Sequence, residues 1–303
     1  MNRNSTKSNI LLLTAAFIWG FAFVAQRVGM DYIGAFTYNA VRFALGSIAI
    51  IPIIIFFKKD DEREIKVPSN RIYLYGVIAG IFIFAGSSLQ QVGLIGTPAG
   101  KAAFITGLYI VIVPILGVFL KHKIGLNSWI GAIIAVFGLY ILSVGSDFSI
   151  ANSDLLELAG AFFFALHILV IDYFSARVNS IKLAFIQYVT CSILSFIVAF
   201  ASEKIDLQSI GMAAIPIIYG GVFSVGIAYT LQILGQKGAK PTHAAIILSM
   251  ESVFASIGGF LILQENLGAR GLAGCGLMLV GMICSQINFS RKGKLQGQEK
   301  KSA

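Results

Sequence analysis

The stretch GKAAFITGLYIVIVPILGVFL, residues 100–120, holds a single charged side chain, that of Lys101. An α-helix of about 20 apolar residues crosses the hydrocarbon core of a bilayer, so this stretch predicts a transmembrane helix. Similar stretches recur along all 303 residues. We expect ten spans: Ile10–Val28, Phe36–Phe57, Ile72–Val92, Ala99–Leu120, a short fifth at Trp129–Val144, Leu155–Tyr173, Leu183–Ala201, Ala213–Leu234, Thr242–Leu263 and Leu272–Asn288.

The composition supports a membrane protein. Hydrophobic residues make up 57% of the chain, charged residues only 12%, and the mean hydropathy is +0.83. A soluble domain needs about twice that charged fraction to cover its surface. The three cysteines lie within apolar runs and show no metal-ligand spacing, so we expect neither a metal site nor a disulfide framework.

The basic residues give the chain a net charge of +9, and their distribution predicts an orientation. Positive residues accumulate in cytoplasmic loops of membrane proteins. With the N-terminus in the cytoplasm, 18 of the 23 Lys and Arg residues lie in cytoplasmic segments, and only Arg27, Lys101, Lys204 and Arg270 lie outside. Arg42 alone falls within a span. We therefore expect a multi-pass protein of the cytoplasmic (inner) membrane with both termini in the cytoplasm, and no binding of nucleic acid.

The chain contains an internal repeat. AAFIWGFA (15–22) aligns with GAFFFALH (160–167) at an offset of 145 residues, and SLQQVGLIG (88–96) aligns with TLQILGQKG (230–238) at an offset of 142. Gly131 and Gly138 align with Gly274 and Gly281 at an offset of 143. We expect a first five-helix repeat over residues 10–144, a second over 155–288, and a basic cytoplasmic tail over 289–303.

An odd number of spans in each repeat means that the second copy must be inverted in the membrane. The predicted fold class is therefore an all-α polytopic membrane protein whose ten transmembrane helices form two inverted five-helix repeats. Inverted repeats are typical of secondary transporters, which bind substrate between the two halves and work by alternating access. Prolines Pro52 and Pro114 predict bending points in spans two and four.

Five segments carry a resemblance to a known family: AAFIWGFAFVAQR (15–27), the Arg-Phe pair of VRFALGS (41–47), residues 100–120, WIGAIIAVFGLYIL (129–142) and LQENLG (263–268). On these, the chain resembles the ten-span EamA-domain family of the drug/metabolite transporter superfamily. The resemblance implies a carrier, typically an exporter of metabolites, amino acids or drugs, with a central cavity lined mainly by the first four helices of each repeat. The family's acidic residue after the fourth helix of a repeat is present as Glu265, and Lys123 stands at the equivalent position of the first repeat.

Polar and ionisable residues within spans are the candidates for a substrate or proton pathway, because placing them in a bilayer is costly. Packing, interhelical hydrogen bonding and snorkelling of the side chain to the interface are the structural alternatives for each of them. The candidates are Glu251, His243, Lys101, Arg42, Tyr109, Trp19, His167, Gln187, Gln90 and Gln232.

Glu251 is the strongest candidate because it is the carboxylate closest to the centre of a span. A buried carboxyl group can be neutral while enclosed and ionised when exposed to water, which is how proton carriers use such a residue. His243, eight residues earlier, is placed to pass protons toward the cytoplasm, and Arg42 or Lys101 to compete for the carboxylate. The alternative is a permanent pair between Glu251 and a cation that holds helices together.

The function favoured by the sequence is export of a small metabolite, amino acid or drug by a secondary transporter, with protons as a possible second partner. We expect no enzyme activity and no cofactor, because GTPAGKA (96–102) lacks the spacing of a phosphate loop and the three histidines are scattered. A channel-like facilitator of the same fold is the alternative, and an intramembrane enzyme or sensor is a weaker one. The oligomeric state stays open.

Overall fold

The structure, a computed structural model, describes residues 3–56, 71–121, 124–143, 151–264 and 268–286. The basic tail, the loop over 57–70, Lys123 and Glu265 lie outside the described residues. Within the described ranges every regular element is helical. These are α1 (Arg3–Gly29), α2 (Ala35–Phe56), α3 (Arg71–Gly93), α4 (Ala99–Gly107), α5 (Tyr109–Phe119), α6 (Leu126–Ser143), α7 (Asn152–Ser175), α8 (Ser180–Ser202), α9 (Leu207–Met212), α10 (Ala214–Ile218), the π-helix η2 (Tyr219–Tyr229), α11 (Thr230–Gln236), α12 (Pro241–Leu248), α13 (Glu251–Ile262) and α14 (Gly268–Gln286).

These elements confirm the predicted fold class. By length and composition, nine helices or runs of consecutive helices in the described ranges can cross a membrane. The remaining span is the fifth along the chain, α6. Its apolar stretch, Leu126–Ile141, is shorter than the others, as predicted from the sequence. Large apolar side chains such as Phe119, Phe200 and Leu272 are exposed on the outside of the bundle, as lipid-facing side chains would be. The short exposed helix α9 was not predicted; the side chain of Asp206 caps its first turn.

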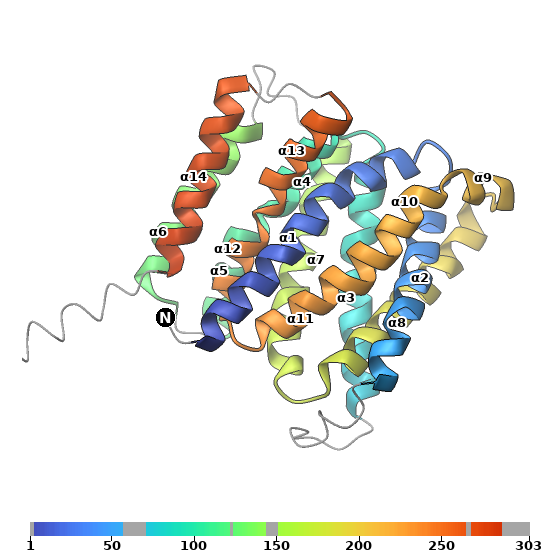
Figure 1. Cartoon of the computed structure of the whole chain (residues 1–303), viewed down its shortest axis with the longest axis horizontal. Coiled ribbons are helices and arrows are strands. Elements are labelled where there is room, and N and C mark those ends of the chain that lie inside the picture. The colour runs from blue at the N-terminus through green and yellow to red at the C-terminus, as the bar shows by residue number, and fades with distance from the viewer. Residues whose placement is uncertain (1–2, 57–70, 122–123, 144–150, 265–267, 287–303) are drawn as a thin grey trace, which may run out of the picture.

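Corresponding helices of the two repeats run in opposite directions. In Figure 1, α1 rises from the lower side whereas α7 descends, and α6 rises beside the descending α14. The fourth span of each repeat is also broken near its middle. One break separates α4 from Tyr109 at the start of α5, and the other separates α12 from Glu251 at the start of α13. Tyr109 and Glu251 are 142 residues apart, which is the repeat offset, so the two breaks are equivalent.

Proline does not cause the break in span four. The predicted bending point was Pro114, but α5 continues through this residue and the interruption lies at Leu108, six residues earlier. The second repeat has Ser256 at the position that corresponds to Pro114, and its fourth span is interrupted as well. The break therefore belongs to the duplicated architecture, because it is present with and without the proline.

The last helices of the two repeats pack closely through glycine. A Cβ atom added to Gly138 would lie 2.7 Å from the carbonyl oxygen of Gly274. One added to Gly131 would lie 2.7 Å from the carbonyl oxygen of Gly281, and the reverse distance is 2.6 Å. Small residues allow such close approach of backbones where no hydrophobic effect drives helices together. The pairing is crossed, as expected of two antiparallel copies: the first glycine of each repeat meets the second glycine of the other repeat.

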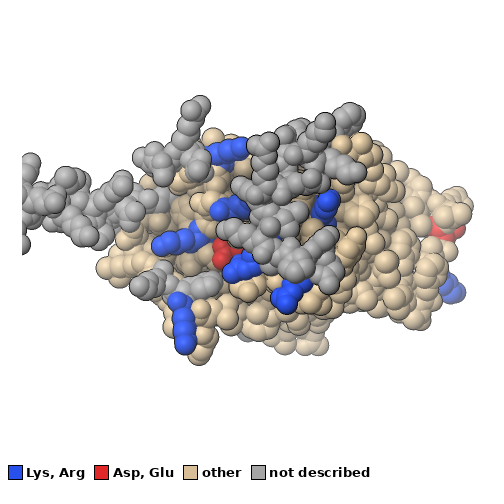
Figure 2. Space-filling view, turned by 90° about the horizontal axis from the view of Figure 1, so that it is seen from below, with Lys and Arg blue, Asp and Glu red and all other residues tan. Residues whose placement is uncertain are grey.

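The two ends of the bundle differ in charge. Figure 2 shows the face on which α1 begins, and Lys and Arg side chains gather there. The helix ends on this face carry Lys7, Arg71, Lys121, Arg177, Lys182, Lys237 and Lys240. The opposite face carries most of the acidic residues that the structure describes, namely Asp31, Asp154, Glu203 and Asp206, which balance its four basic residues Arg27, Lys101, Lys204 and Arg270. We call the first face basic and the second face acidic.

The glycine contact predicts a stability difference between two substitutions. Gly138→Ala forces α6 and α14 apart, because the added atom meets backbone that cannot move aside, and we expect it to lower the free energy of unfolding by about 1–3 kcal/mol. Gly276→Ala is the control, since a Cβ atom there has no neighbour within 4 Å. Alanine is favoured over glycine in a helix by about 1 kcal/mol, so this control is neutral or stabilising. Thermal unfolding in detergent micelles measures both, and equal stability of the two variants would contradict the packing account.

Candidate functional site

A small cavity lies in the middle of the bundle, between the repeats. Its volume is about 40 Å³, which is room for roughly three water molecules. All lining residues except the half-buried Trp19 are at most 9% exposed, so buried side chains make up nearly the whole wall. The lining consists of Trp19, Phe23, Gln26, Arg42, Gln90, Thr106, Tyr109, Phe164, His167, Ile168, Ser224, Tyr229, Gln232, Leu248 and Glu251.

Much of this wall consists of equivalent positions from the two repeats. At the repeat offsets of 145 and 142 residues, five pairs of positions both line the cavity. They are Trp19 with Phe164, Phe23 with Ile168, Gln90 with Gln232, Thr106 with Leu248, and Tyr109 with Glu251. A cavity that receives both members of each pair lies on the axis that relates the repeats.

Tyr109 and Glu251 meet at the centre of the cavity wall. The Tyr109 hydroxyl donates a hydrogen bond of 2.9 Å to Oε1 of Glu251, and both residues are almost fully buried. Two side chains that occupy equivalent positions can touch each other only near the axis itself. Each is also the first residue after the break in its span, so the interrupted helices bring the carboxyl group to this point.

Among the described residues of the wall, Arg42 is the one lysine or arginine. Its side chain is 2% exposed, and Nε donates a hydrogen bond of 2.9 Å to Oδ1 of Asn39. The guanidinium lies 5.5 Å from the ring centre of Tyr38 and 5.2 Å from that of Phe43. Asn39 in turn donates to the backbone carbonyl of Ser87, which ties α2 to α3. Arg42 does not pair with Glu251.

Of the other predicted residues of the wall, His167, Trp19 and Gln90 make side-chain hydrogen bonds. The Nε2 atom of His167 lies 3.0 Å from Oε1 of Gln187, which is itself buried behind the wall. Trp19 donates from Nε1 to the carbonyl of Ser224 at 3.2 Å, and its ring packs on that of Tyr229 with centres 4.6 Å apart. Gln90 and Gln232 line the cavity from α3 and α11.

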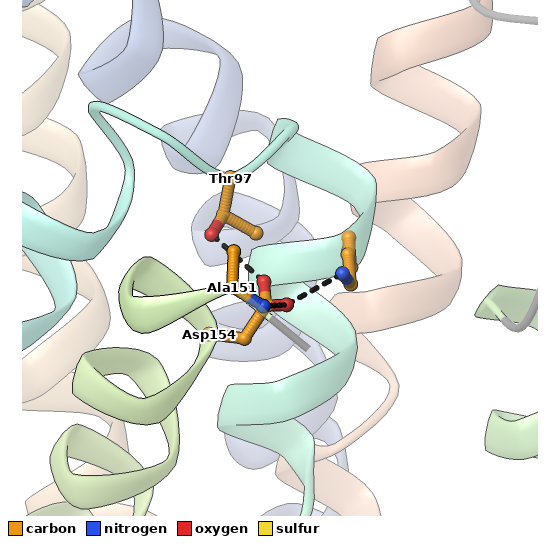
Figure 3. A network of polar contacts seen from close by, with 4 residues as sticks. Thr97, Ala151 and Asp154 are labelled. Atoms are coloured by element: carbon orange, nitrogen blue, oxygen red, sulfur yellow. Dashed lines mark hydrogen bonds and ion pairs between the residues drawn. The ribbon is translucent and has the colours of Figure 1, made fainter. Parts of the chain in front are cut away.

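Lys101 lies away from the cavity, at the acidic face. Its Nζ atom forms an ion pair of 2.6 Å with Oδ2 of Asp154, the residue that caps the first turn of α7. Figure 3 shows that the same carboxylate accepts hydrogen bonds from the Thr97 hydroxyl at 3.0 Å and from the Ala151 amide at 2.8 Å. The structure therefore joins α4 of the first repeat to α7 of the second, and Lys101 does not compete for Glu251.

His243 occupies the equivalent position at the basic face. Its Nε2 atom lies 2.9 Å from Oδ1 of Asn9 in α1. His243 and Asn9 correspond to Lys101 and Asp154 at the repeat offsets of 142 and 145 residues. One contact thus occurs twice: the fourth span of each repeat binds the first helix of the other repeat. We call Lys101–Asp154 the acidic-face latch and His243–Asn9 the basic-face latch.

Sequence analysis missed a second buried carboxyl group, Glu157. It is fully buried in α7, and its Oε2 atom accepts a hydrogen bond of 3.3 Å from the Thr106 hydroxyl. Gln90 donates to the same hydroxyl from Nε2 at 3.0 Å, so a polar chain leads from the cavity to Glu157. Glu157 is the third residue of the predicted span Leu155–Tyr173, so its sequence position does not indicate burial.

Tyr229 and Ser224 were also missed, and both belong to η2. A π-helix of 11 residues is rare, and π-helical turns concentrate at functional sites. Nothing in the sequence YGGVFSVGIAY distinguishes a π-helix from an α-helix, because apolar segments with several glycines form either. Only the way in which η2 packs against α1 and α2 makes these two residues part of the wall.

Comparison with known proteins identifies the family. The model of the EamA-like transporter family matches residues 6–144 and again residues 152–286. The chain belongs to the EamA-like transporter family. It is 32% identical over 274 residues to a protein named as an uncharacterized transporter of Archaeoglobus fulgidus, covering 90% of this chain and 83% of the relative.

A more distant relative comes from a bacterium. The chain is 24% identical to a protein of Salmonella typhimurium named as a probable amino-acid metabolite efflux pump, over 94% of this chain and 96% of the relative. A crystal structure of a protein that is 16% identical superposes with a TM-score of 0.76, over 92% of this chain and 96% of the other. This likeness extends the shared fold to the whole bundle.

The polar chain predicts a stability effect at Thr106. Thr106→Val keeps the shape of the side chain but leaves the Gln90 amide without its acceptor and Glu157 without its donor. A buried polar group without a partner costs about 1–3 kcal/mol, and we expect a loss of that size in the free energy of unfolding. Thr106→Ser keeps the hydroxyl and is the control. Thermal unfolding compares the two, and a valine variant at least as stable as the serine variant would contradict the network.

Proposed function

We propose that this EamA-family protein is a secondary transporter that moves a small molecule by alternating access. The observation that carries the proposal is a cavity of mostly buried side chains between the repeats, with one latch at each face. In this arrangement each latch separates the cavity from one side of the membrane. Opening the acidic-face latch exposes the cavity to one side, and opening the basic-face latch exposes it to the other. Both latches are formed in the structure, and on this proposal it represents the state between the two openings.

The channel-like alternative fits the cavity less well. A channel needs a continuous path with polar or charged rings along it. Here almost every lining side chain is buried, and the described wall carries one arginine and one glutamate, not rings of charged side chains. The names of the EamA relatives support transport over catalysis, and in the part of the chain that the structure describes, no group of three His, Cys, Asp or Glu residues lies close enough to hold a metal ion.

For orientation, we infer that the basic face lies in the cytoplasm and the acidic face outside the cell membrane. The described Lys and Arg residues at the helix ends favour this direction. Export is the favoured direction of transport, on the analogy of the Salmonella relative named as an efflux pump. In this orientation the basic-face latch admits substrate and the acidic-face latch releases it.

We further infer that Glu251 couples transport to protons. Its carboxyl group lies in the cavity wall and is held by an uncharged phenol, not by a cation, so protonation does not have to break an ion pair. The other charged or titratable groups of the wall are Tyr109, Tyr229, His167 and Arg42. A carboxyl group that is neutral in the closed state and ionised when a latch opens releases its proton to the open side.

The variant Glu251→Gln tests the coupling, because it keeps the shape and the acceptor for Tyr109 but cannot titrate. Proteoliposomes with an acidic interior are placed in a metabolite extract, and mass spectrometry identifies the compounds that accumulate. We expect the wild type to accumulate compounds against their gradient. The variant should still exchange them between the two sides but lose accumulation driven by the pH gradient.

The control for this experiment is Asp31→Asn, which removes an exposed carboxylate at the end of α1. It should accumulate the same compounds as the wild type. Undiminished accumulation by Glu251→Gln would disprove the coupling. Loss of folded protein in Glu251→Gln would instead assign Glu251 to holding the helices together. A wild type that moves no compound would contradict the transport proposal itself.

A further inference from the structure

Arg42 is a buried charge without an opposite charge beside it. Among the residues that the structure describes, its only hydrogen bond is the one from Nε to Asn39. A guanidinium has five N–H donors, so the four on Nη1 and Nη2 make no bond with a described residue. No described carboxylate lies within ion-pair distance of Arg42, and Glu251 bonds to Tyr109 instead.

The surroundings hold this cation in place without neutralising it. Asn39 fixes one edge of the guanidinium, and the rings of Tyr38 and Phe43 lie about 5 Å from its centre. Asn39 is itself fixed to the backbone of α3 at Ser87. A charge in the middle of a membrane protein is costly, and such charges usually face a partner or a cavity. Arg42 lines the cavity, and no carboxylate among the described residues pairs with it.

We propose that Arg42 binds a carboxylate group of the transported molecule. The inference rests on the proposed transport function and adds the chemical class of the substrate. A guanidinium matches a carboxylate through two parallel N–H···O bonds, which its unused Nη donors can supply. The aromatic wall of Trp19, Phe23 and Tyr229 suits an apolar body attached to that carboxylate. Both a simple carboxylic acid and a zwitterionic amino acid carry this group.

Trp19 makes binding directly measurable. The chain has two tryptophans, and Trp129 lies on α6 outside the cavity wall. In a Trp129→Phe protein the remaining fluorescence comes from Trp19, whose ring packs on Tyr229 in the wall. Titration of this purified protein with a ligand that enters the cavity should change the emission of Trp19.

The probes are matched acids and amides. L-phenylalanine and L-leucine represent zwitterions, 3-phenylpropanoate and 4-methylpentanoate represent simple acids, and the primary amide of each replaces the carboxylate by a neutral group of the same shape. We expect at least one acid to bind 10-fold or more tightly than its amide, the factor that corresponds to a charge-assisted hydrogen bond of roughly 1.5 kcal/mol or more. Whether zwitterions or simple acids bind better separates the two sources of the carboxylate.

Substitution of Arg42 then assigns the binding to this side chain. Arg42→Gln should remove the preference for acid over amide, and Arg42→Lys should keep part of it, because lysine retains the charge but not the paired donors. Arg270→Gln, which removes an exposed arginine at the start of α14, should bind as the parent protein does. If Arg42→Gln does not fold, the preference of the parent protein and its change in Arg42→Lys decide the question.

The outcomes distinguish this inference from the proposed function. If no acid of the panel binds more tightly than its amide, or if Arg42→Lys and Arg42→Gln both keep the full preference, the inference is wrong and transport by some other recognition stands. If acids bind through Arg42 but do not cross a proteoliposome membrane, the inference stands and the transport function is wrong.

Discussion

The hydrogen bond between Tyr109 and Glu251 is the contact on which the rest of the site depends. It joins equivalent positions of two inverted repeats, so it can form only where the repeat axis passes. Both partners stand directly after a break in a membrane-spanning helix, and those breaks bring polar groups to the centre of the bilayer. The cavity, its paired walls and the central carboxyl group follow from this one constraint.

The repeats share their architecture but not their chemistry. At the acidic-face latch an ion pair with three donors to one carboxylate connects the repeats, whereas the basic-face latch is a contact between a histidine and an asparagine. The Lys101 side chain is 36% exposed and that of Asp154 is 8% exposed, so this ion pair is only partly screened by water. On the proposed mechanism the two faces open by breaking different contacts, an ion pair at one and a histidine–asparagine contact at the other. The same asymmetry places Arg42 opposite Gln187 in the repeat alignment, so only one half of the cavity wall is cationic.

Much of the fold could be predicted from the sequence because its causes are local. Lengths of apolar sequence set the spans, and the odd number of spans in each repeat requires inversion. Of the ten candidate site residues, Trp19, Arg42, Gln90, Tyr109, His167, Gln232 and Glu251 line the cavity, and Gln187 supports His167 from behind. Lys101 and His243 lie at the two faces because each is in the first turn of a helix, and this turn contacts the first helix of the other repeat. Glu157, Tyr229 and the break at Leu108 could not be predicted, since burial depth, π-helical geometry and helix interruption depend on contacts between distant segments.

The most direct test of alternating access measures one distance at each face by pulsed EPR in a cysteine-free protein. Spin labels at Ile95 and Leu155 flank the acidic-face latch, and labels at Ile10 and Lys240 flank the basic-face latch; all four side chains are exposed. The Lys101→Met change should lengthen the acidic-face distance and leave the basic-face distance at its closed value, and His243→Ala should do the reverse. Lengthening of both distances in either variant would mean that the two faces open together, as in a channel, and would contradict the account.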